Sequence, residues 1–283
     1  MRDLSVSIVN YNSGDSLRKC LESIKNNIKT DGYEVIVVDN NSSDGSELCI
    51  RDYPFVRLIK NRMNYGASIA KNQSFRESDS KYVLILDSDI EILPGCLERL
   101  MDFLEKNKKA GIVGPRVLFG DLRPQHSSNK HFPGFISLFL NKLFFFSNIR
   151  YAFYRSMAGS WFLKKRYSGL EEAAWLGGMC LLARKDLLDK IKGMDERFFI
   201  YYDDVDLCLR TRVEGYKVYY LPEASVVHHM GKSFGGFNKF LFLRIYESEL
   251  YFFEKHYGDP GKKIAYGLIL CGLYLRIAIG FLF

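Results

Sequence analysis

Apolar residues near the start of the chain switch between continuous runs and helical spacing. The run LSVSIVNYN, residues 4–12, is rich in β-branched residues and ends in polar ones, which predicts a strand. Apolar residues then recur at spacings of four, three and four, at Leu17, Leu21, Ile24 and Ile28. Because this spacing places them on one face of a helix, the first unit is predicted to be strand, turn and helix.

Further units of the same kind follow along the chain. YEVIVVD at residues 33–39, VRLIKN at 56–61 and KYVLILDSD at 81–89 predict strands, and NYGASIAKN at 64–72 precedes a helix. Strands that alternate with helices predict a parallel sheet with right-handed crossovers. The predicted fold class is therefore α/β, a Rossmann-like sheet flanked by helices.

Polar residues follow the predicted strands at their carboxyl ends. They are Asn10, Tyr11, Asn12, Asp39, Asn61, Arg62, Asp87, Ser88 and Asp89. A single Asn or Asp after a strand is usually a turn residue or a helix cap. In an open α/β sheet this edge is where ligands bind, so consecutive polar strand ends predict a shared site.

The sequence also limits how phosphates could be held at that edge. Neither the GxGxxG dinucleotide motif nor the GxxxxGK[ST] P-loop is present. Asp87 and Asp89 lie two residues apart after a strand, so they point to the same side and can share a hard divalent cation. An Asp-x-Asp pair is a weak signal alone, and its place directly after KYVLIL makes it more specific.

Two apolar stretches lie in the later part of the chain. Residues 264–283, IAYGLILCGLYLRIAIGFLF, have about the length that a helix needs to cross a hydrocarbon core of about 30 Å, although Arg276 interrupts them. Residues 132–154 are apolar and aromatic-rich, with few charges. Either stretch could instead be a helix packed on the protein's own core. We expect contact with a membrane surface for the tail, and either of the two for the middle stretch.

Charge and cysteine content narrow the setting. The net charge of +7 suits a polyanion, a phosphorylated small molecule or an anionic membrane, but Lys and Arg form no dense run, which disfavours nucleic-acid binding. The six cysteines form no CxxC pair, and no signal-peptide pattern precedes the first strand. We therefore expect reduced thiols and a cytoplasmic location, at the inner face of the cell membrane.

One further stretch, YYDDVDLCLR at residues 201–210, places three carboxylates among apolar residues. Asp203 and Asp204 can open a helix, where they offset the positive end of its dipole. Val205, Leu207 and Leu209 of that helix would then face the core.

The motifs together resemble those of the inverting family 2 glycosyltransferases of the GT-A fold. The first half carries SIVNYN, VVDNNSSDGS, NxGxxxAxN and LILDSD in the family's order. WLGGMCL at 175–181, residues 192–216 and ASVVHHMGKS at 224–233 resemble the rhamnosyltransferase-like branch. The resemblance implies a GT-A type mixed sheet over residues 4–235, followed by an apolar helical segment.

Site roles follow from this resemblance, position by position. Asp204 would be the catalytic base, although the chain has Asp203-Asp204 where the family has a Glu-Asp pair. The resemblance implies donor binding by Asn10, Tyr11, Asn12, Asp39, Asn64, Gly66, Asn72 and Asp87. Acceptor binding would involve Trp175, Gly178 and Asp203, and Mg²⁺ or Mn²⁺ would be held by Asp87, Asp89 and His228. His229 is an alternative to His228, and Trp175 could equally be a packing anchor.

The expected reaction explains why the chain has two carboxylate clusters. Inverting sugar transfer from a nucleotide diphosphate needs a base for the acceptor hydroxyl and a cation for the leaving diphosphate. We expect a rhamnose-like deoxyhexose to be moved to a glycan or polyprenyl-linked acceptor, in cell-surface polysaccharide synthesis. A sugar nucleotidyltransferase and a non-catalytic nucleotide- or carbohydrate-binding subunit are the alternatives.

The expected organisation has three parts. Residues 1–110 form the nucleotide-sugar-binding half and residues 111–240 the acceptor-binding and catalytic-base half of one GT-A domain. Residues 241–283 form a helical, membrane-associating tail.

Overall fold

A nine-stranded mixed sheet organises the protein. The structure, a computed structural model, describes residues 2–28, 32–142, 168–229 and 239–280. The strands in chain order are β1 (Arg2–Asn10), β2 (Tyr33–Asp39), β3 (Val56–Lys60), β4 (Ser80–Asp87), β5 (Ile90–Ile92), β6 (Ala110–Phe119), β7 (Ser128–Asn129), β8 (Glu171–Ala173), β9 (Trp175–Leu176), β10 (Cys180–Arg184) and β11 (Lys217–His228). The sheet runs β3-β2-β1-β4-β10-β6-β11-β5, with β8 also on β11, while β7 and β9 form a separate pair.

The strand directions place the predicted polar ends together. Strands β1 to β4 are mutually parallel, as the alternating strands and helices predicted. Strand β10 then enters antiparallel between β4 and β6, so the sheet is mixed. The carboxyl ends of β1 to β4 thus share one edge, and β11 brings His228 to the same end through its pairing with β5. The predicted α/β fold class is confirmed.

Helices cover both faces of the sheet. They are α1 (Ser16–Asn27), α2 (Ala67–Glu77), α3 (Cys96–Lys106), α4 (Phe135–Lys142), α7 (Lys185–Lys190), α8 (Asp203–Val213) and α9 (Lys239–Gly280), with a 3₁₀ helix η1 (Ser46–Asp52). One core joins the sheet to α1 and α3, and a second joins its other face to α7 and α8. Helix α1 buries Leu17, Leu21 and Ile24, which confirms the helical spacing predicted for that stretch.

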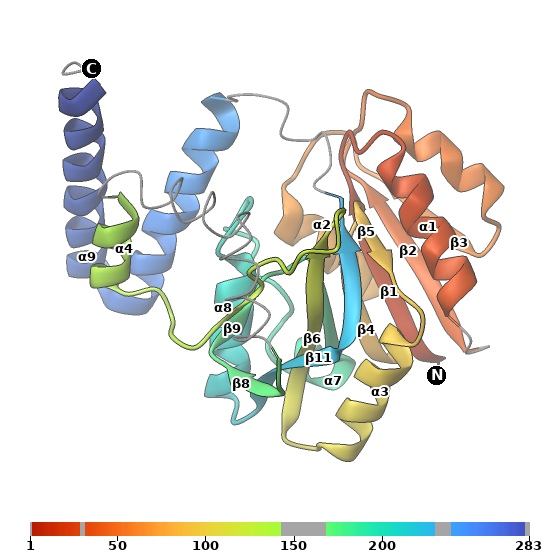
Figure 1. The fold of residues 1–283 in the computed structure, drawn as a ribbon. Coiled ribbons are helices and arrows are strands. Elements are labelled where there is room, and N and C mark those ends of the chain that lie inside the picture. Colours follow the sequence, from red (N-terminus) through yellow and green to blue (C-terminus); the bar gives the residue numbers. More distant parts are fainter. Residues whose placement is uncertain (1, 29–31, 143–167, 230–238, 281–283) are drawn as a thin grey trace.

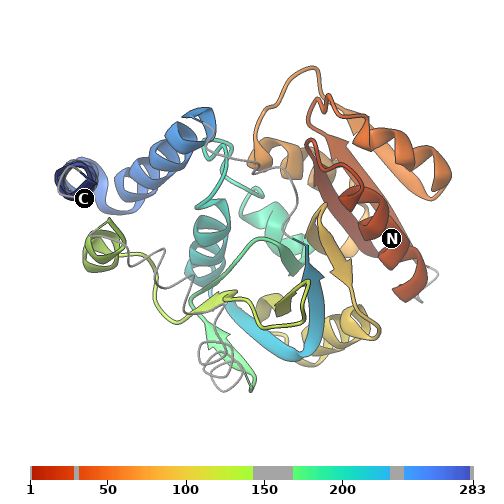
Figure 2. The same cartoon turned by 45° about the horizontal axis from the view of Figure 1, so that its top comes forward.

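The C-terminal helix α9 lies apart from the sheet. Gly258 has φ 71° and Pro260 follows, which breaks α9 into two arms, 239–257 and 259–280, joined by a sharp turn (Figure 1). Figure 2 shows that α8 lies between the sheet and the helices α4 and α9. A third core of Leu138, Phe198, Val205, Phe252, Phe253, Ala265 and Ile269 joins α4, α8 and both arms.

The apolar stretches predicted from the sequence are partly covered by these elements. Residues 135–142 of the middle stretch form α4, and its residues 143–154 lie outside the described part of the chain. The tail from residue 264 to residue 280 belongs to the second arm of α9. Among the described residues, no helix has both the length and the apolar character that a membrane span requires. The three-part division of the chain stays a prediction, although strands from both predicted halves share the sheet.

Candidate active site

The ends of β1 and β2 are tied together by side chains. Asn10 Nδ2 donates to Asp39 Oδ1 at 2.8 Å, and also to the hydroxyls of Ser42 and Ser46. Ser42 Oγ donates to Asp39 Oδ1 at 2.6 Å, and its backbone N–H donates to Asp39 Oδ2. Asn10 and Asp39 are both buried. They therefore form a rigid floor at this end of the sheet.

The end of β3 and the start of α2 join this network through Asn40. Its Nδ2 donates to Asn64 Oδ1 at 3.0 Å and to the carbonyl of Gly66 at 3.0 Å. Asn61 Nδ2 donates back to Asn40 Oδ1 at 2.9 Å. The sequence prediction that these strand ends meet at one edge is confirmed by these contacts.

A carboxylate and an imidazole face each other next to this edge. His228 Nε2 lies 3.3 Å from Asp89 Oδ2, and both side chains are largely buried. On the other side of the ring, His228 Nδ1 lies 3.0 Å from Gln125 Oε1. Gln125 thus contacts Nδ1 and leaves Nε2 facing the Asp89 carboxylate.

Electrostatics ties Asp87 to the same group. Burial raises the pKa of Asp87 to about 6, with a further rise from the charge of Asp89, while Lys71 and His228 oppose it. Burial alone would lower the pKa of His228, but the hydrogen bond and charge of Asp89 raise it above its ordinary value. Both pKa shifts show that an added positive charge is favourable between Asp87, Asp89 and His228.

These residues fit a cation that keeps open positions. Asp89 and His228 supply an oxygen and a nitrogen donor at close range, with Asp87 beside them. Within the described ranges, no group of three or more His, Cys, Asp or Glu side chains is arranged to hold a metal ion. Mg²⁺ is usually bound through one or two carboxylates plus substrate phosphates, so a small protein donor set suits it.

Asp204 lies in the first turn of α8, partly exposed to solvent. Its Oδ2 accepts from the backbone N–H of Gly178 at 2.8 Å, and its Oδ1 accepts from Val205 N–H at 2.8 Å. Burial and then the charge of Asp203 raise the pKa of Asp204 to about 7, against the opposing effects of Lys71 and the two backbone N–H groups. An oriented carboxylate with this pKa can take a proton at neutral pH.

Lys71 links Asp204 to the cluster at the sheet edge. Its Nζ donates to Asp203 Oδ2 at 2.8 Å, and both side chains are buried. Burial would lower the pKa of Lys71, but the charges of Asp203, Asp87 and Asp204 raise it. A Cβ on Gly178 would lie 3.6 Å from Lys71 Nζ and 3.5 Å from Asp204 Oδ2. One lysine thus lies among the carboxylates of both acidic motifs.

Tyr201 is a second link between the two acidic groups. Burial and then the charges of Asp87, Asp204 and Asp203 raise the pKa of its phenol. Its side chain is still 44% exposed. Tyr201 therefore lies near carboxylates of both groups, with part of its side chain open to solvent.

The remaining predicted site residues differ in their surroundings. Tyr11 is 43% exposed, and Asn12 Oδ1 accepts from Ser43 N–H. Asn72 is buried, and its amide bonds to both backbone groups of Met194 and to Glu196. Trp175 Nε1 donates to His131 O at 3.1 Å while the ring packs in the second core. Trp175 thus has the packing contacts of an anchor, and Asn72 holds the loop before α8.

Several residues of the site were not found from the sequence. Gln125 orients His228, and Lys71 is bonded to Asp203. Lys71 lies between Ala70 and Asn72 of the NxGxxxAxN motif, on the buried face of α2. A lysine on the buried face of a helix next to an acidic sheet edge was a usable signal. Gln125 lies in a loop, where the sequence carries no comparable pattern.

Comparison with known proteins identifies the family. A model of glycosyl transferase family 2 matches residues 5–168, more than half of the chain. The chain belongs to glycosyl transferase family 2. This family 2 glycosyltransferase is 28% identical over 252 residues to an N-acetylglucosaminyl-diphospho-decaprenol L-rhamnosyltransferase of Mycobacterium tuberculosis, covering 82% of this chain and 78% of that protein. It is 24% identical over 233 residues to rhamnosyltransferase WbbL of Escherichia coli, covering 79% and 82% of the two chains.

Solved structures agree on the fold of this glycosyltransferase. TarS of S. aureus (residues 1–349) superposes with a TM-score of 0.55 at 14% identity, over 80% of this chain and 60% of that one. GalNAc-T7 with UDP, GalNAc and Mn²⁺ gives a TM-score of 0.62 at 14% identity, over 82% of this chain and 44% of that one. The predicted GT-A type fold is thereby confirmed.

Proposed function

We propose that this glycosyltransferase is metal-dependent and inverting. In this proposal it moves a rhamnose-like deoxyhexose from a nucleotide diphosphate to a glycan or polyprenyl-linked glycan in cell-surface polysaccharide synthesis. The relatives named as rhamnosyltransferases, one of them for a decaprenol-linked acceptor, support the sugar and the acceptor class. The observation that carries the proposal is the partly exposed Asp204 carboxylate, which is oriented by the N–H groups of Gly178 and Val205 beside the buried Lys71–Asp203 pair.

The proposed chemistry uses Asp204 as the base. As the acceptor hydroxyl oxygen attacks the anomeric carbon, its proton moves to the Asp204 carboxylate and the bond from that carbon to the diphosphate oxygen breaks. Attack opposite the leaving group inverts the anomeric centre. The N–H groups of Gly178 and Val205 hold the carboxylate in place during this step. Tyr201 and the buried Lys71 limit the access of water.

The donor is proposed to lie along the carboxyl ends of β1 to β4. The nucleoside would rest against the floor formed by Asn10 and Asp39, with Tyr11 and Asn12 at its rim. Mg²⁺ or Mn²⁺ held by Asp89 and His228, with Asp87 beside them, would neutralise charge on the leaving diphosphate. Gln125 keeps the Nε2 atom of His228 directed at Asp89.

The second arm of α9 is proposed to contact the membrane surface. Its buried side includes Ala265 and Ile269, while Ile264, Tyr266, Tyr274 and Ile277 are each about half exposed or more. A helix that is apolar on both its packed and its solvent side is typical of a lipid interface. Lys262 and Lys263 at its start are exposed and suit anionic headgroups, and the six free cysteines are consistent with a reducing compartment at its inner face.

A donor screen tests the chemistry. The purified full chain is incubated with nucleotide sugars, Mg²⁺ or Mn²⁺ and lipid-linked or soluble glycan acceptors. We expect acceptor-dependent release of nucleoside diphosphate, suppressed by EDTA and by Asp204→Asn. Pyrophosphate release would instead indicate a nucleotidyltransferase, and donor binding without turnover would indicate a binding subunit.

Vesicle flotation tests the membrane proposal separately. The chain should float with vesicles containing anionic phospholipid and less well with neutral ones. The variant Tyr274→Ser/Ile277→Ser should lose flotation and keep turnover of a soluble acceptor. Equal recovery of wild type with and without vesicles would exclude membrane contact by this arm.

A further inference from the structure

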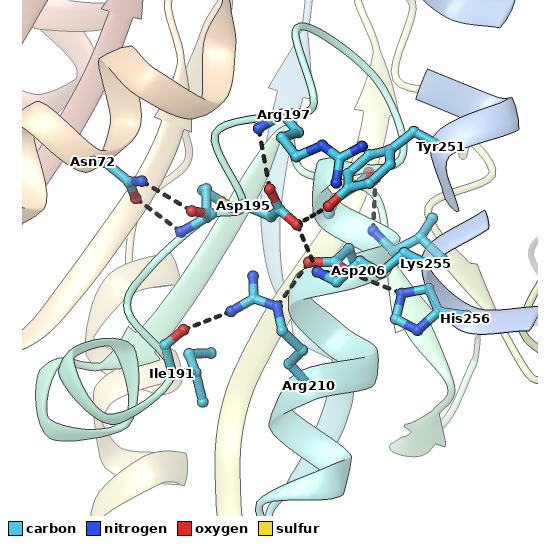
Figure 3. Close-up of polar contacts among 12 residues, drawn as sticks. Asn72, Ile191, Asp195, Arg197, Asp206, Arg210, Tyr251, Lys255 and His256 are labelled. Atoms are coloured by element: carbon cyan, nitrogen blue, oxygen red, sulfur yellow. Dashed lines mark hydrogen bonds and ion pairs between the residues drawn. The ribbon is translucent and has the colours of Figure 1, made fainter. Parts of the chain in front are cut away.

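The base-bearing segment, residues 195–206, is bonded to the first arm of α9, which lies on the side away from the sheet (Figure 2). The segment begins at Asp195, ends at Asp206 and contains Asp204. Lys255 Nζ donates to Asp195 Oδ2 at 2.8 Å and to Asp206 Oδ1 at 2.6 Å (Figure 3). One ammonium group of α9 therefore connects the two ends of the segment.

Both ends are fixed by further partners. Asp206 is fully buried and also accepts from Arg210 Nε at 2.7 Å and lies 2.9 Å from His256 Nε2. Asp195 accepts from Tyr251 Oη at 2.6 Å and from the N–H of Arg197. Figure 3 shows these side chains converging from α8 and α9 and from the loop before α8.

The middle of the segment is held by the same arm. Tyr202 Oη donates to Glu249 Oε1 at 2.7 Å, and the centroid of its ring lies 5.2 Å from that of the Phe252 ring. Glu249 is buried and pairs with Lys142 of α4 at 2.6 Å. The ring of Phe198, earlier in the segment, lies 4.8 Å from that of Tyr251.

The conformation of the segment requires such support. Tyr201 and Tyr202 both have φ 63°, a left-handed conformation that is strained for residues with bulky side chains. Two consecutive residues in this state persist only where the surroundings hold them. The chain enters α8 directly after them, so their conformation determines where Asp204 meets Gly178.

The opposite side of the segment is held by α2. Ala67 N–H donates to Phe199 O at 2.7 Å, and the Asn72 amide bonds to Met194. The segment therefore lies between the donor-side helix α2 and the C-terminal helix α9. Loss of the contacts with α2 or with α9 would leave the segment held on one side only.

We propose that the first arm of α9 is part of the catalytic apparatus, an inference that rests on the proposed base role of Asp204. In this proposal Lys255 and Glu249 are positioning residues, which hold the segment 195–206 in the conformation needed for catalysis. They touch neither sugar nor metal and act through Asp195, Asp206 and Tyr202. A displacement of a catalytic group by about 1 Å can lower a rate about 100-fold, so this support is expected to affect turnover.

Lys255→Met tests this proposal, with Glu254→Gln as the matched control. Glu254 is the neighbour of Lys255 in α9 and also forms an ion pair, but its partner Lys262 is exposed. We expect Lys255→Met to lower kcat per folded molecule at least about tenfold and leave the donor KM within about twofold. Tyr202→Phe, which removes only one hydroxyl, should lower kcat in the same way, and less than additively with Lys255→Met.

Hydrogen exchange gives a readout that does not depend on activity. Lys255→Met should speed amide exchange in residues 195–206 and leave that of β1 to β4 unchanged, whereas Glu254→Gln should change neither. Unaltered exchange in this segment, or an unaltered kcat in both Lys255→Met and Tyr202→Phe, would overturn the inference. Wild-type protein that turns over no donor but shows the expected exchange would count against the proposed function alone.

Discussion

Asp204 and Asp206 are the same residue type, half a helical turn apart in α8, yet their surroundings differ in almost every respect. Asp204 is partly exposed and accepts only backbone N–H groups, next to the like charge of Asp203. Asp206 has no exposed surface and contacts Arg210, Lys255 and His256. Burial alone would raise the pKa of Asp206, but the hydrogen bond from His256 and the charges of Arg210 and Lys255 lower it to about 2.

The comparison shows that partners, and not position on a helix, decide what a carboxylate does. The cations around Asp206 keep it ionised under all ordinary conditions, so it serves structure. Around Asp204, burial and the charge of Asp203 outweigh the opposing charge of Lys71, which leaves Asp204 able to accept a proton near neutral pH. One helix therefore carries the proposed proton acceptor on its open side and an ionic anchor on its closed side.

The largest expected effect is on turnover in Asp204→Asn. Removal of a general base typically costs about 10²- to 10⁴-fold, and we expect kcat to fall by about 10³-fold. The donor KM should change little, because the donor is expected at the strand ends. Steady-state release of nucleoside diphosphate measures both constants. Retention of more than a tenth of wild-type kcat would assign the base elsewhere.

Asp206→Asn should instead affect stability. Removing one member of a buried ionic cluster leaves the cations of Lys255 and Arg210 uncompensated, so we expect the free energy of unfolding to fall by about 3 to 5 kcal/mol. Urea unfolding followed by circular dichroism measures it. Asp102→Asn, which breaks an exposed pair with Lys106 in α3, is the control and should change it by less than about 0.5 kcal/mol. Equal effects in the two variants would contradict the comparison.

The pH dependence should separate the two carboxylates within one protein. Below the pKa of about 7, Asp204 becomes protonated, so kcat should fall about tenfold per pH unit between pH 6.5 and 5. This protonation relieves a buried charge and does not destabilise the fold. The contribution of Asp206 is present above its unfolded pKa and is lost only as pH falls toward about 2. Activity should therefore disappear at a pH where the melting temperature is maintained.

The smallest effect is expected for Gly178→Ala. A Cβ there would lie 3.2 Å from the Cβ of Asp204, so the carboxylate must move by a few tenths of an ångström while the N–H donor stays. We expect kcat to fall a few-fold, with little change in the melting temperature. Gly169→Ala, where a Cβ meets no atom within 4 Å, is the matched control. A loss as large as that of Asp204→Asn would show that residue 178 itself contacts the acceptor.

The sequence predicted the sheet edge better than the supports around the base. The contacts among Asn10, Asp39 and Asn40 join the ends of neighbouring strands, so strand order and polar ends were enough to place them. The opening of α8 at Asp203 was also predicted, because acidic residues precede an apolar helical pattern.

The supports were not predicted because they join distant segments. Lys71 and Asp203 are 132 positions apart, and Gln125 and His228 are 103 apart. Strand β10 enters the sheet antiparallel between β4 and β6, which no periodicity in the sequence indicates. Lys255 and Glu249 lie in a stretch that the sequence predicts to be a membrane-associating tail, and such a tail gives no reason to expect their buried ionic contacts.

Gly66 has a consequence for how this glycosyltransferase could change over evolution or in the laboratory. A Cβ at this position would lie 2.7 Å from the carbonyl oxygen of Phe199 and 2.8 Å from its ring. The turn on the proposed nucleotide side thus touches the loop leading to the proposed base, with no room for one methyl group. Redesigning that turn to accept another sugar donor would therefore shift the acceptor side as well. We expect donor specificity and acceptor specificity to change together.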